Sequence, residues 1–129
     1  MKRYSLEHGE QVRLMVWASL KTCEHPELDL LYAIPNGGQR NIIVAKRMKD
    51  EGMKAGVPDL HLPVARGEFH SLYIEMKSPS LKPKRGGRGG VTTLQADWHE
   101  RLRAQGNAVE ICYGATEAEN VITNYLNLK

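Results

Sequence analysis

The chain has 129 residues, of which 41% are hydrophobic and 26% are charged, as in an ordinary globular protein. This length predicts one domain that spans residues 1–129 and can bury a core of its own. No apolar run approaches the ~18 residues needed to cross a bilayer, and the first residues lack the apolar segment of a secretion signal. The two cysteines, Cys23 and Cys112, have no matching second pair of ligands, which excludes a zinc finger. We therefore expect a cytoplasmic protein without a membrane segment.

The net charge of +3 is small, but the basic residues are unevenly distributed. The stretch from residue 77 to residue 103 contains only two acidic residues, Asp97 and Glu100, against Lys77, Lys82, Lys84, Arg85, Arg88, Arg101 and Arg103. A local basic patch is typical of proteins that bind a polyanion, because neutralising phosphates supplies most non-specific affinity. A solvated basic loop without a partner is the alternative explanation.

The first half of the chain predicts a helix, a strand and a second helix. Residues 5–22 form an expected helix with an apolar stripe of Leu6, Val12, Met15, Val16 and Leu20, spaced as on one helix face. Residues 28–34 are mostly apolar and precede the turn sequence Pro35-Asn36-Gly37-Gly38, which indicates a strand followed by a turn. Residues 41–51 form the second expected helix, which ends at Gly52.

The middle of the chain predicts a β-hairpin. Residues 57–64 form a strand candidate with prolines at both ends, as in an edge or bulged strand. Residues 69–76 are rich in aromatic and β-branched residues, which favours a central strand. Residues 66–68 connect the two segments, and an antiparallel pairing would place Asp59 beside Glu75.

The last third predicts a loop, a helix, a strand and a closing helix. Residues 78–92 contain two prolines and four glycines, so we expect a mobile loop. Residues 93–105 form an amphipathic helix with Leu94, Trp98 and Leu102 at four-residue spacing, residues 109–113 an apolar strand, and residues 116–126 the closing helix. The predicted order is therefore α-β-α-β-β-α-β-α, an α/β fold in which helices flank a mixed sheet.

Three charged residues of the predicted hairpin point to metal chemistry. Residues two apart in a strand project from the same face, so Glu75 and Lys77 share one side, while Ile74 and Met76 face the core. With Asp59 on the neighbouring strand, two carboxylates and an ammonium group converge. Carboxylate oxygens suit Mg2+, which keeps positions for water and a substrate phosphate. A nearby lysine can orient or deprotonate an attacking water. An Asx turn at Asp59 and a Glu75–Lys77 salt bridge are the structural alternatives.

This arrangement resembles the PD-(D/E)xK nuclease superfamily, here as Pro58-Asp59 followed by Glu75-Met76-Lys77. The wider pattern is similar to the VRR-NUC family, in Asn36-Gly37-Gly38, Arg40, Lys54-Ala55-Gly56-Val57-Pro58-Asp59-Leu60, Ile74-Glu75-Met76-Lys77, Gln95-Ala96-Asp97-Trp98 and Gly106. The resemblance covers residues 7–126. It implies a restriction-endonuclease-like fold and a metal-dependent nuclease of phage or bacterial type.

The resemblance also implies roles for further residues. A glutamate of the first helix, followed by a glutamine four residues later, completes the metal site, which favours Glu7 over Glu10 as that acid. The Met76 carbonyl is a further candidate ligand, and Gln95 extends the motif near the phosphate. The remaining expected contacts to nucleic acid are Asn36, Gly37, Arg40, Lys54, Lys82, Lys84, Arg85 and Arg88.

We therefore predict a Mg2+-dependent, structure-selective DNA endonuclease, with Mn2+ able to replace Mg2+. The resemblance implies branched DNA such as Holliday junctions as the substrate and a homodimer as the active form. Two other functions remain open at this stage: a non-catalytic nucleic-acid-binding module of the same fold, and a nuclease directed at RNA. The sequence also leaves open whether one or two metal ions act.

Overall fold

The computed structural model describes residues 3–35 and 41–129, with side chains from residue 6 onward within those ranges. The elements in chain order are α1 (Arg3–Lys21), the 3-10 helix η1 (Pro26–Leu30), β1 (Tyr32–Ala33), α2 (Ile42–Asp50), β2 (Leu60–Leu62), β3 (Leu72–Lys77), the 3-10 helix η2 (Pro79–Leu81), α3 (Thr93–Ala104), β4 (Ala108–Tyr113) and α4 (Ala115–Leu126). The order of α-helices and strands confirms the predicted one. None of the described helices has the length and apolar character needed to cross a membrane.

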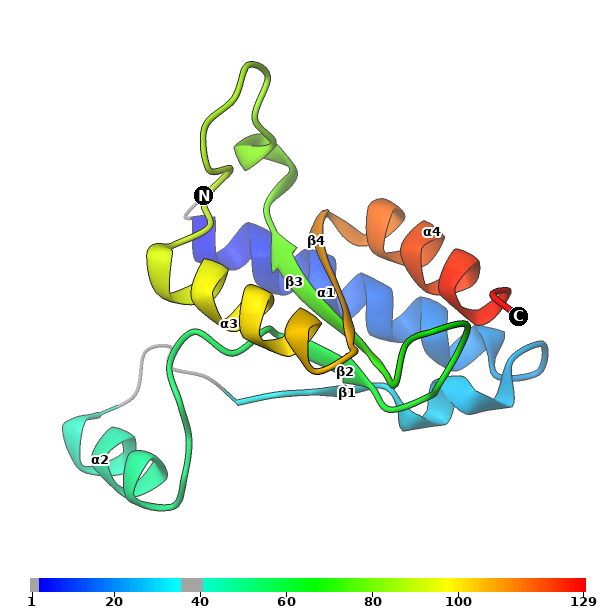
Figure 1. Ribbon diagram of the computed structural model, residues 1–129. Helices are drawn as coiled ribbons and strands as arrows, with labels where there is room; N and C mark the ends of the chain where they lie inside the picture. Colours follow the sequence, from blue (N-terminus) through cyan, green and yellow to red (C-terminus); the bar gives the residue numbers. More distant parts are fainter. Residues whose placement is uncertain (1–2, 36–40) are drawn as a thin grey trace.

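Over the residues that the structure describes, the sheet has four strands in the order β1-β2-β3-β4 and is mixed, as predicted. The β1–β2 and β2–β3 pairs are antiparallel, and β3 and β4 are parallel. Helices α1 and α4 lie side by side on one face of the sheet, and α3 lies on the other (Figure 1). The core between α1, α4 and the sheet includes Leu14, Ala18, Leu72, Ile74, Met76, Cys112, Ala118 and Ile122. Both faces of β3 are therefore covered, and all but one of its residues are buried.

The hairpin of β2 and β3 has the predicted antiparallel pairing, with Leu60 opposite Ile74. An isolated bridge between Arg66 and Phe69 closes its turn. Gly67 lies between them with a φ of +56°, a left-handed conformation that glycine adopts without steric cost.

The segment that leads into β2 lies tightly against α3. Gly56 has a φ of +92°, and a Cβ atom there would come within 2.6 Å of Leu94 and 2.9 Å of Trp98. Only glycine allows the backbone to pass this close to the helix. This contact positions the chain just before Asp59.

The predicted strand at residues 28–34 was wrong in its first half. Residues Pro26–Leu30 form η1 instead, and only Tyr32–Ala33 pair in the sheet. Pro26 lies in the first turn of η1, where its missing N–H and its fixed φ favour helical geometry. Leu28 and Leu31 are both buried in the core, so the apolar residues pack as parts of a helical turn rather than of a strand.

The predicted apolar faces of two helices are also corrected. In α1, Leu14 and Ala18 are buried, whereas Val12, Val16 and Leu20 are 47%, 55% and 72% exposed. In α3, Leu94 is largely exposed, and His99 is the buried residue. Both helices contact the sheet through a different face from the one that hydrophobicity alone predicts.

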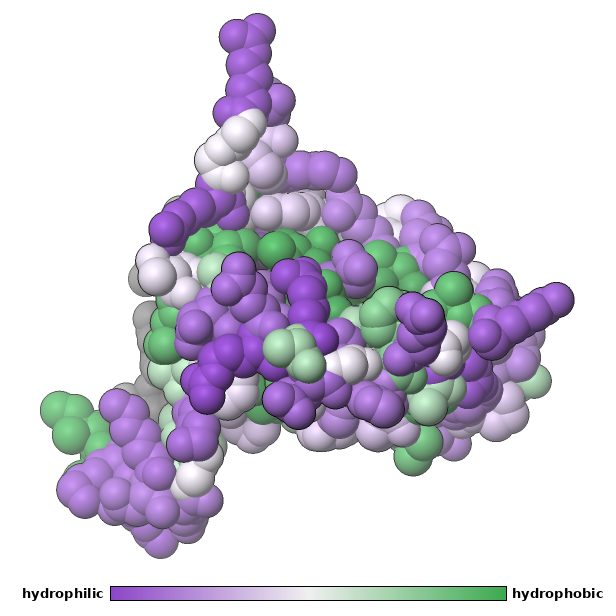
Figure 2. Space-filling model, viewed as in Figure 1, coloured by the Kyte–Doolittle hydropathy of each residue, from purple (hydrophilic) through white to green (hydrophobic). Residues whose placement is uncertain are grey.

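Helix α2 projects from the body of the molecule (Figure 1) and has no buried residue. Ile42 and Ile43, in its first turn, are 86% and 71% exposed. Figure 2 shows the resulting hydrophobic surface at the end of this helix, away from the rest of the protein.

Candidate active site

Two carboxyl groups lie together where β2 and β3 meet. Asp59 is one residue beyond the Leu60–Ile74 pair, and its backbone N–H donates to the Ile74 carbonyl at 3.0 Å. The Asp59 side chain is hydrogen-bonded to Glu75, and its Oδ2 accepts a hydrogen bond from the Met76 N–H at 2.7 Å. The hairpin thus brings together the two acids that the sequence predicts.

Burial makes this carboxyl pair unusually basic. Burial, together with the hydrogen bond to Glu75 and its charge, raises the pKa of Asp59 to about 8. Burial also raises the pKa of Glu75, against the opposing effects of Asp59 and Lys77. Burial and the repulsion between two neighbouring carboxylates outweigh the opposing effect of Lys77, so the pair holds a proton at neutral pH. A cation that replaced the proton would remove this penalty.

Gln95 lies between Lys77 and Glu75 and contacts both. Its Oε1 accepts a hydrogen bond from Lys77 Nζ at 3.0 Å, and its Nε2 lies 3.5 Å from Glu75 Oε2. The same Gln95 completes a capping box with Thr92 at the start of α3, so the helix cap fixes the amide in place. Lys77 is 6% exposed, and its ammonium group is held beside the carboxyl pair.

His99 belongs to this site, although the sequence analysis did not select it. Its ring is almost completely buried, with Nε2 3.1 Å from Glu75 Oε1. Burial, and to a lesser extent the charges of Arg103 and Lys77, lower the pKa of His99, so a neutral ring contacts Glu75 at neutral pH. The signal was available in the spacing, because His99 follows Gln95 by four residues and lies on the same helix face.

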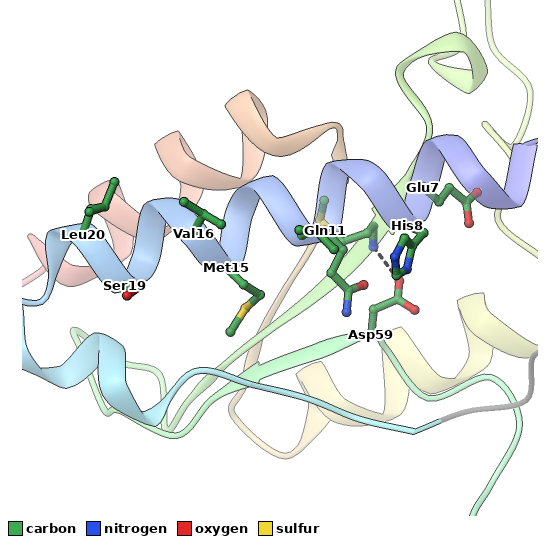
Figure 3. Close-up of a pocket in the computed structure, with 10 residues that line it drawn as sticks. Glu7, His8, Gln11, Met15, Val16, Ser19, Leu20 and Asp59 are labelled. Carbon is green, nitrogen blue, oxygen red and sulfur yellow. Dashed lines mark hydrogen bonds between the residues drawn. The ribbon is translucent and has the colours of Figure 1, made fainter.

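The two candidate acids of α1 have different surroundings. Glu10 Oε1 accepts a hydrogen bond from the Ala115 N–H at 2.9 Å, and its Oε2 pairs with Arg13 at 3.0 Å. Glu10 therefore caps α4, whose own N-cap residue, Gly114, has no side chain. Glu7 instead lines the same groove as Asp59 (Figure 3), and its negative charge contributes to the raised pKa of Glu75.

A groove of about 550 Å³ runs along α1 from the Asp59 carboxyl group. In Figure 3, Glu7, His8 and Gln11 lie near Asp59 at one end, and Val16, Ser19 and Leu20 follow along the helix toward the other. The groove thus has a polar end at Asp59 and a largely apolar wall on α1.

The donor set fits a hard divalent cation. No group of three or more His, Cys, Asp or Glu side chains is arranged to hold a metal within residues 3–35 and 41–129. Mg2+ does not need such a cage, because it typically binds through one or two carboxylates and keeps several waters. Asp59 and Glu75 meet that requirement, and the Met76 carbonyl lies in β3, directly after Glu75.

The predicted nucleic-acid contacts are divided among several surfaces. Asn36, Gly37 and Arg40 lie outside the described residues. Lys54 is exposed and lines a second groove of about 440 Å³, whose wall includes Trp98. In the loop after β3, Lys84 and Arg85 are exposed, Lys82 pairs with Glu117, and Arg88 donates to Thr93 Oγ1 at 2.7 Å.

The loop of residues 78–92 is anchored at both ends. Its start forms η2, and the Tyr113 hydroxyl donates to the Gly89 carbonyl at 3.1 Å near its end. Val91 is buried before α3 begins. The basic residues between these anchors therefore extend from a fixed base beside Lys77.

The fold and this site define a mixed α/β domain with a carboxylate–lysine centre on a β-hairpin. The sequence matches the model of the VRR-NUC domain over residues 1–116, and the chain belongs to this nuclease-type family. A solved structure of a VRR_NUC domain protein superposes with a TM-score of 0.75 at 27% sequence identity, covering 95% of this chain and 89% of the other. A comparison with curated proteins finds no match.

Proposed function

We propose that this protein is a Mg2+-dependent, structure-selective DNA endonuclease that hydrolyses phosphodiester bonds in branched DNA such as Holliday junctions. The carboxyl pair of half-buried Asp59 and buried Glu75 carries the proposal, because the hairpin brings these two acids together beside Lys77, where a bound cation would offset their negative charge. Family membership supports the nuclease activity, and the preference for branched DNA rests on the family resemblance.

Asp59 and Glu75, with the Met76 carbonyl and Glu7, would hold Mg2+, and Mn2+ would replace it. When bound, the cation supplies Lewis-acid stabilisation of charge on the phosphate. Lys77 is held by Gln95 beside the carboxyl pair, where its ammonium group can orient water and stabilise negative charge in the transition state. His99 and Gln95 fix the orientation of the Glu75 carboxylate.

The exposed basic residues beside the site support a nucleic-acid substrate. Lys84 and Arg85 extend from the anchored loop, where they would contact phosphates without reading sequence. RNA has the same phosphates, so a nuclease directed at RNA is the alternative within this mechanism.

A homodimer is part of the proposal. Contiguous exposed apolar patches can mark interaction sites, and a nine-residue helix such as α2 is marginal in water without packing. The end of α2 (Ile42, Ile43) lacks cover in the single chain. Contact between two copies would bury this surface twice, once on each side of a two-fold axis.

The direct test is a cleavage assay of a labelled four-way junction, linear duplex and matched RNA junction, each with Mg2+ and with EDTA. We expect the wild-type protein to nick the DNA junction only with Mg2+, and Glu75→Gln to be inactive. Thermal melts of both proteins in EDTA show whether Glu75→Gln folds, and calorimetric titration of Mg2+ then measures the loss of metal binding. Binding of DNA by the wild-type protein without cleavage in Mg2+ or Mn2+ would instead favour a non-catalytic binding module.

A further inference from the structure

Three aromatic rings form a row across the strands of the sheet. Tyr32 of β1 lies opposite His61 of β2, and His61 lies opposite Tyr73 of β3. The His61 and Tyr73 rings are stacked, with centroids 4.1 Å apart and an angle of 14° between their planes. Tyr32 meets His61 edge-on, at 5.4 Å and 76°. We call these three residues the aromatic row.

Hydrogen bonds hold the aromatic row in one arrangement. The Tyr32 hydroxyl lies 2.8 Å from His61 Nδ1, and His61 Nε2 lies 3.0 Å from Ser71 Oγ. Ser71 in turn donates to Asn107 Oδ1 at 2.7 Å. Rings that are already ordered lose little conformational entropy when a ligand stacks on them.

Despite these contacts, the outer end of the row is open. Tyr32 is 48% exposed, and His61 and Tyr73 are only half-buried. Helix α3 packs on this face over β4, at the opposite edge of the sheet from β1 (Figure 1). Support of the hairpin explains the half-buried His61–Tyr73 stack, but it does not explain an exposed tyrosine hydrogen-bonded onto that stack.

The aromatic row runs parallel to the carboxyl pair. His61 follows Asp59 by two residues, and Tyr73 precedes Glu75 by two residues, so the same step along both strands separates the row from the acids. Two strand residues span ~7 Å, which is about two base steps of ~3.4 Å in one strand of DNA. Tyr73 and Glu75 also project from the same face of β3.

We propose that the aromatic row binds an unpaired nucleobase of the DNA strand whose phosphate lies at the carboxyl pair, with Tyr32 as its open stacking surface. The inference rests on the proposed nuclease function and adds the feature of the substrate that the site selects. Aromatic side chains on a sheet stack on splayed bases regardless of sequence, whereas bases inside a duplex are not available. The site thus favours DNA with unpaired nucleotides beside the cut.

The test is binding in EDTA, where the proposed hydrolysis cannot occur, measured by fluorescence anisotropy. The probes are a single-stranded oligonucleotide and a fully paired duplex of the same sequence. We expect Tyr32→Leu to weaken binding of the single strand about tenfold, which corresponds to ~1.4 kcal/mol, and to change duplex binding less than twofold. Tyr32→Phe is the matched variant, since it keeps the ring and removes the hydroxyl that bonds to His61, and we expect it to bind the single strand more tightly than Tyr32→Leu.

A second arm changes the DNA instead of the protein. A single strand whose bases are replaced by abasic sites keeps its phosphates, so we expect the wild-type protein to bind it about tenfold more weakly than the intact strand. Equal binding of intact and abasic strands, equal loss of single-strand and duplex binding in Tyr32→Leu, or no binding of single strands would each overturn the proposal. Cleavage by the wild-type protein is scored separately, so a nuclease without this stacking site and a stacking site without nuclease activity give different results.

Discussion

The Nε2 atom of His99 lies 3.1 Å from Oε1 of Glu75, and the two side chains are 3% and 2% exposed. A buried histidine from α3 therefore contacts the carboxylate that β3 brings to the site, and Gln95 approaches the other oxygen of the same group. Glu75 is thus held from one helix by two residues four positions apart. The orientation of this carboxylate depends on how α3 packs, and not only on the hairpin.

Replacing His99 should impair the site without removing a proposed metal ligand. Loss of residues that hydrogen-bond to metal ligands typically costs about 10–100-fold in metal affinity or activity, and we expect this range for His99→Leu in Mg2+ titration and in cleavage. His99→Gln keeps an N–H donor and should retain more of both. If His99→Leu bound Mg2+ as tightly as the wild-type protein does, the contact between His99 and Glu75 would only support packing.

The stability of the metal-free protein should fall as the pH rises from about 4 to about 8. The pKa of Asp59 is raised in the folded state from its ordinary value of 3.8 to about 8, so across this window the folded chain keeps a proton that the unfolded chain has released. Stability therefore decreases with pH through this range and levels off above it. Thermal melts in EDTA at pH 5 and pH 8 measure the effect.

The variant Asp59→Asn isolates this contribution, because its amide does not titrate. We expect its melting temperature to depend less on pH than that of the wild-type protein. Mg2+ should stabilise the wild-type protein more at pH 8 than at pH 6, since a metal ligand must lose its proton to bind. If the melting temperatures of the two proteins in EDTA changed equally with pH, the assignment of the effect to Asp59 would be contradicted.

Glu7 and Glu10 lie three residues apart on α1 but should respond differently to substitution. Glu10→Ala removes the acceptor for the Ala115 N–H, and a lost charged contact at a helix N-terminus costs ~1 kcal/mol. We expect a melting temperature lower by about 4 °C, with cleavage retained. Glu7→Ala should lower both cleavage and Mg2+ affinity. The reverse pattern would assign the site acid to Glu10.

Short-range spacing predicted the parts of the molecule that a hairpin determines. Strand alternation and one antiparallel pairing bring Asp59, Glu75 and Lys77 together, and both can be predicted from the sequence. The surroundings of Glu10 could not be predicted from the sequence, because its role as an acceptor depends on Ala115, 105 residues further along. Long-range packing of this kind decides which of two similar glutamates serves the fold.

The same reason explains the helices. A stripe of Val12, Val16 and Leu20 predicts a buried face only if another element covers it, and in the single chain Leu14 and Ala18 fill the core instead. In α3, polar Gln95 and His99 face the sheet because they contact Lys77 and Glu75. Hydrophobic periodicity thus failed where a helix has either an uncovered apolar face or a polar face turned to the site.

The uncovered apolar residues of α2 give the last prediction. If Ile42 and Ile43 lie in a dimer interface, the wild-type protein should have twice the 14.5 kDa mass of one chain in light scattering at micromolar concentration. Ile42→Glu combined with Ile43→Glu places charges in that interface, where burying them unpaired is costly, and should give the monomer mass. These side chains are 86% and 71% exposed in the single chain, so the double substitution should not lower the melting temperature of the monomer itself.

Lys49→Gln is the control, since it is an exposed polar change on the same helix and should leave the dimer intact. A wild-type protein of monomer mass, or a double variant that keeps the dimer mass, would remove α2 from the interface.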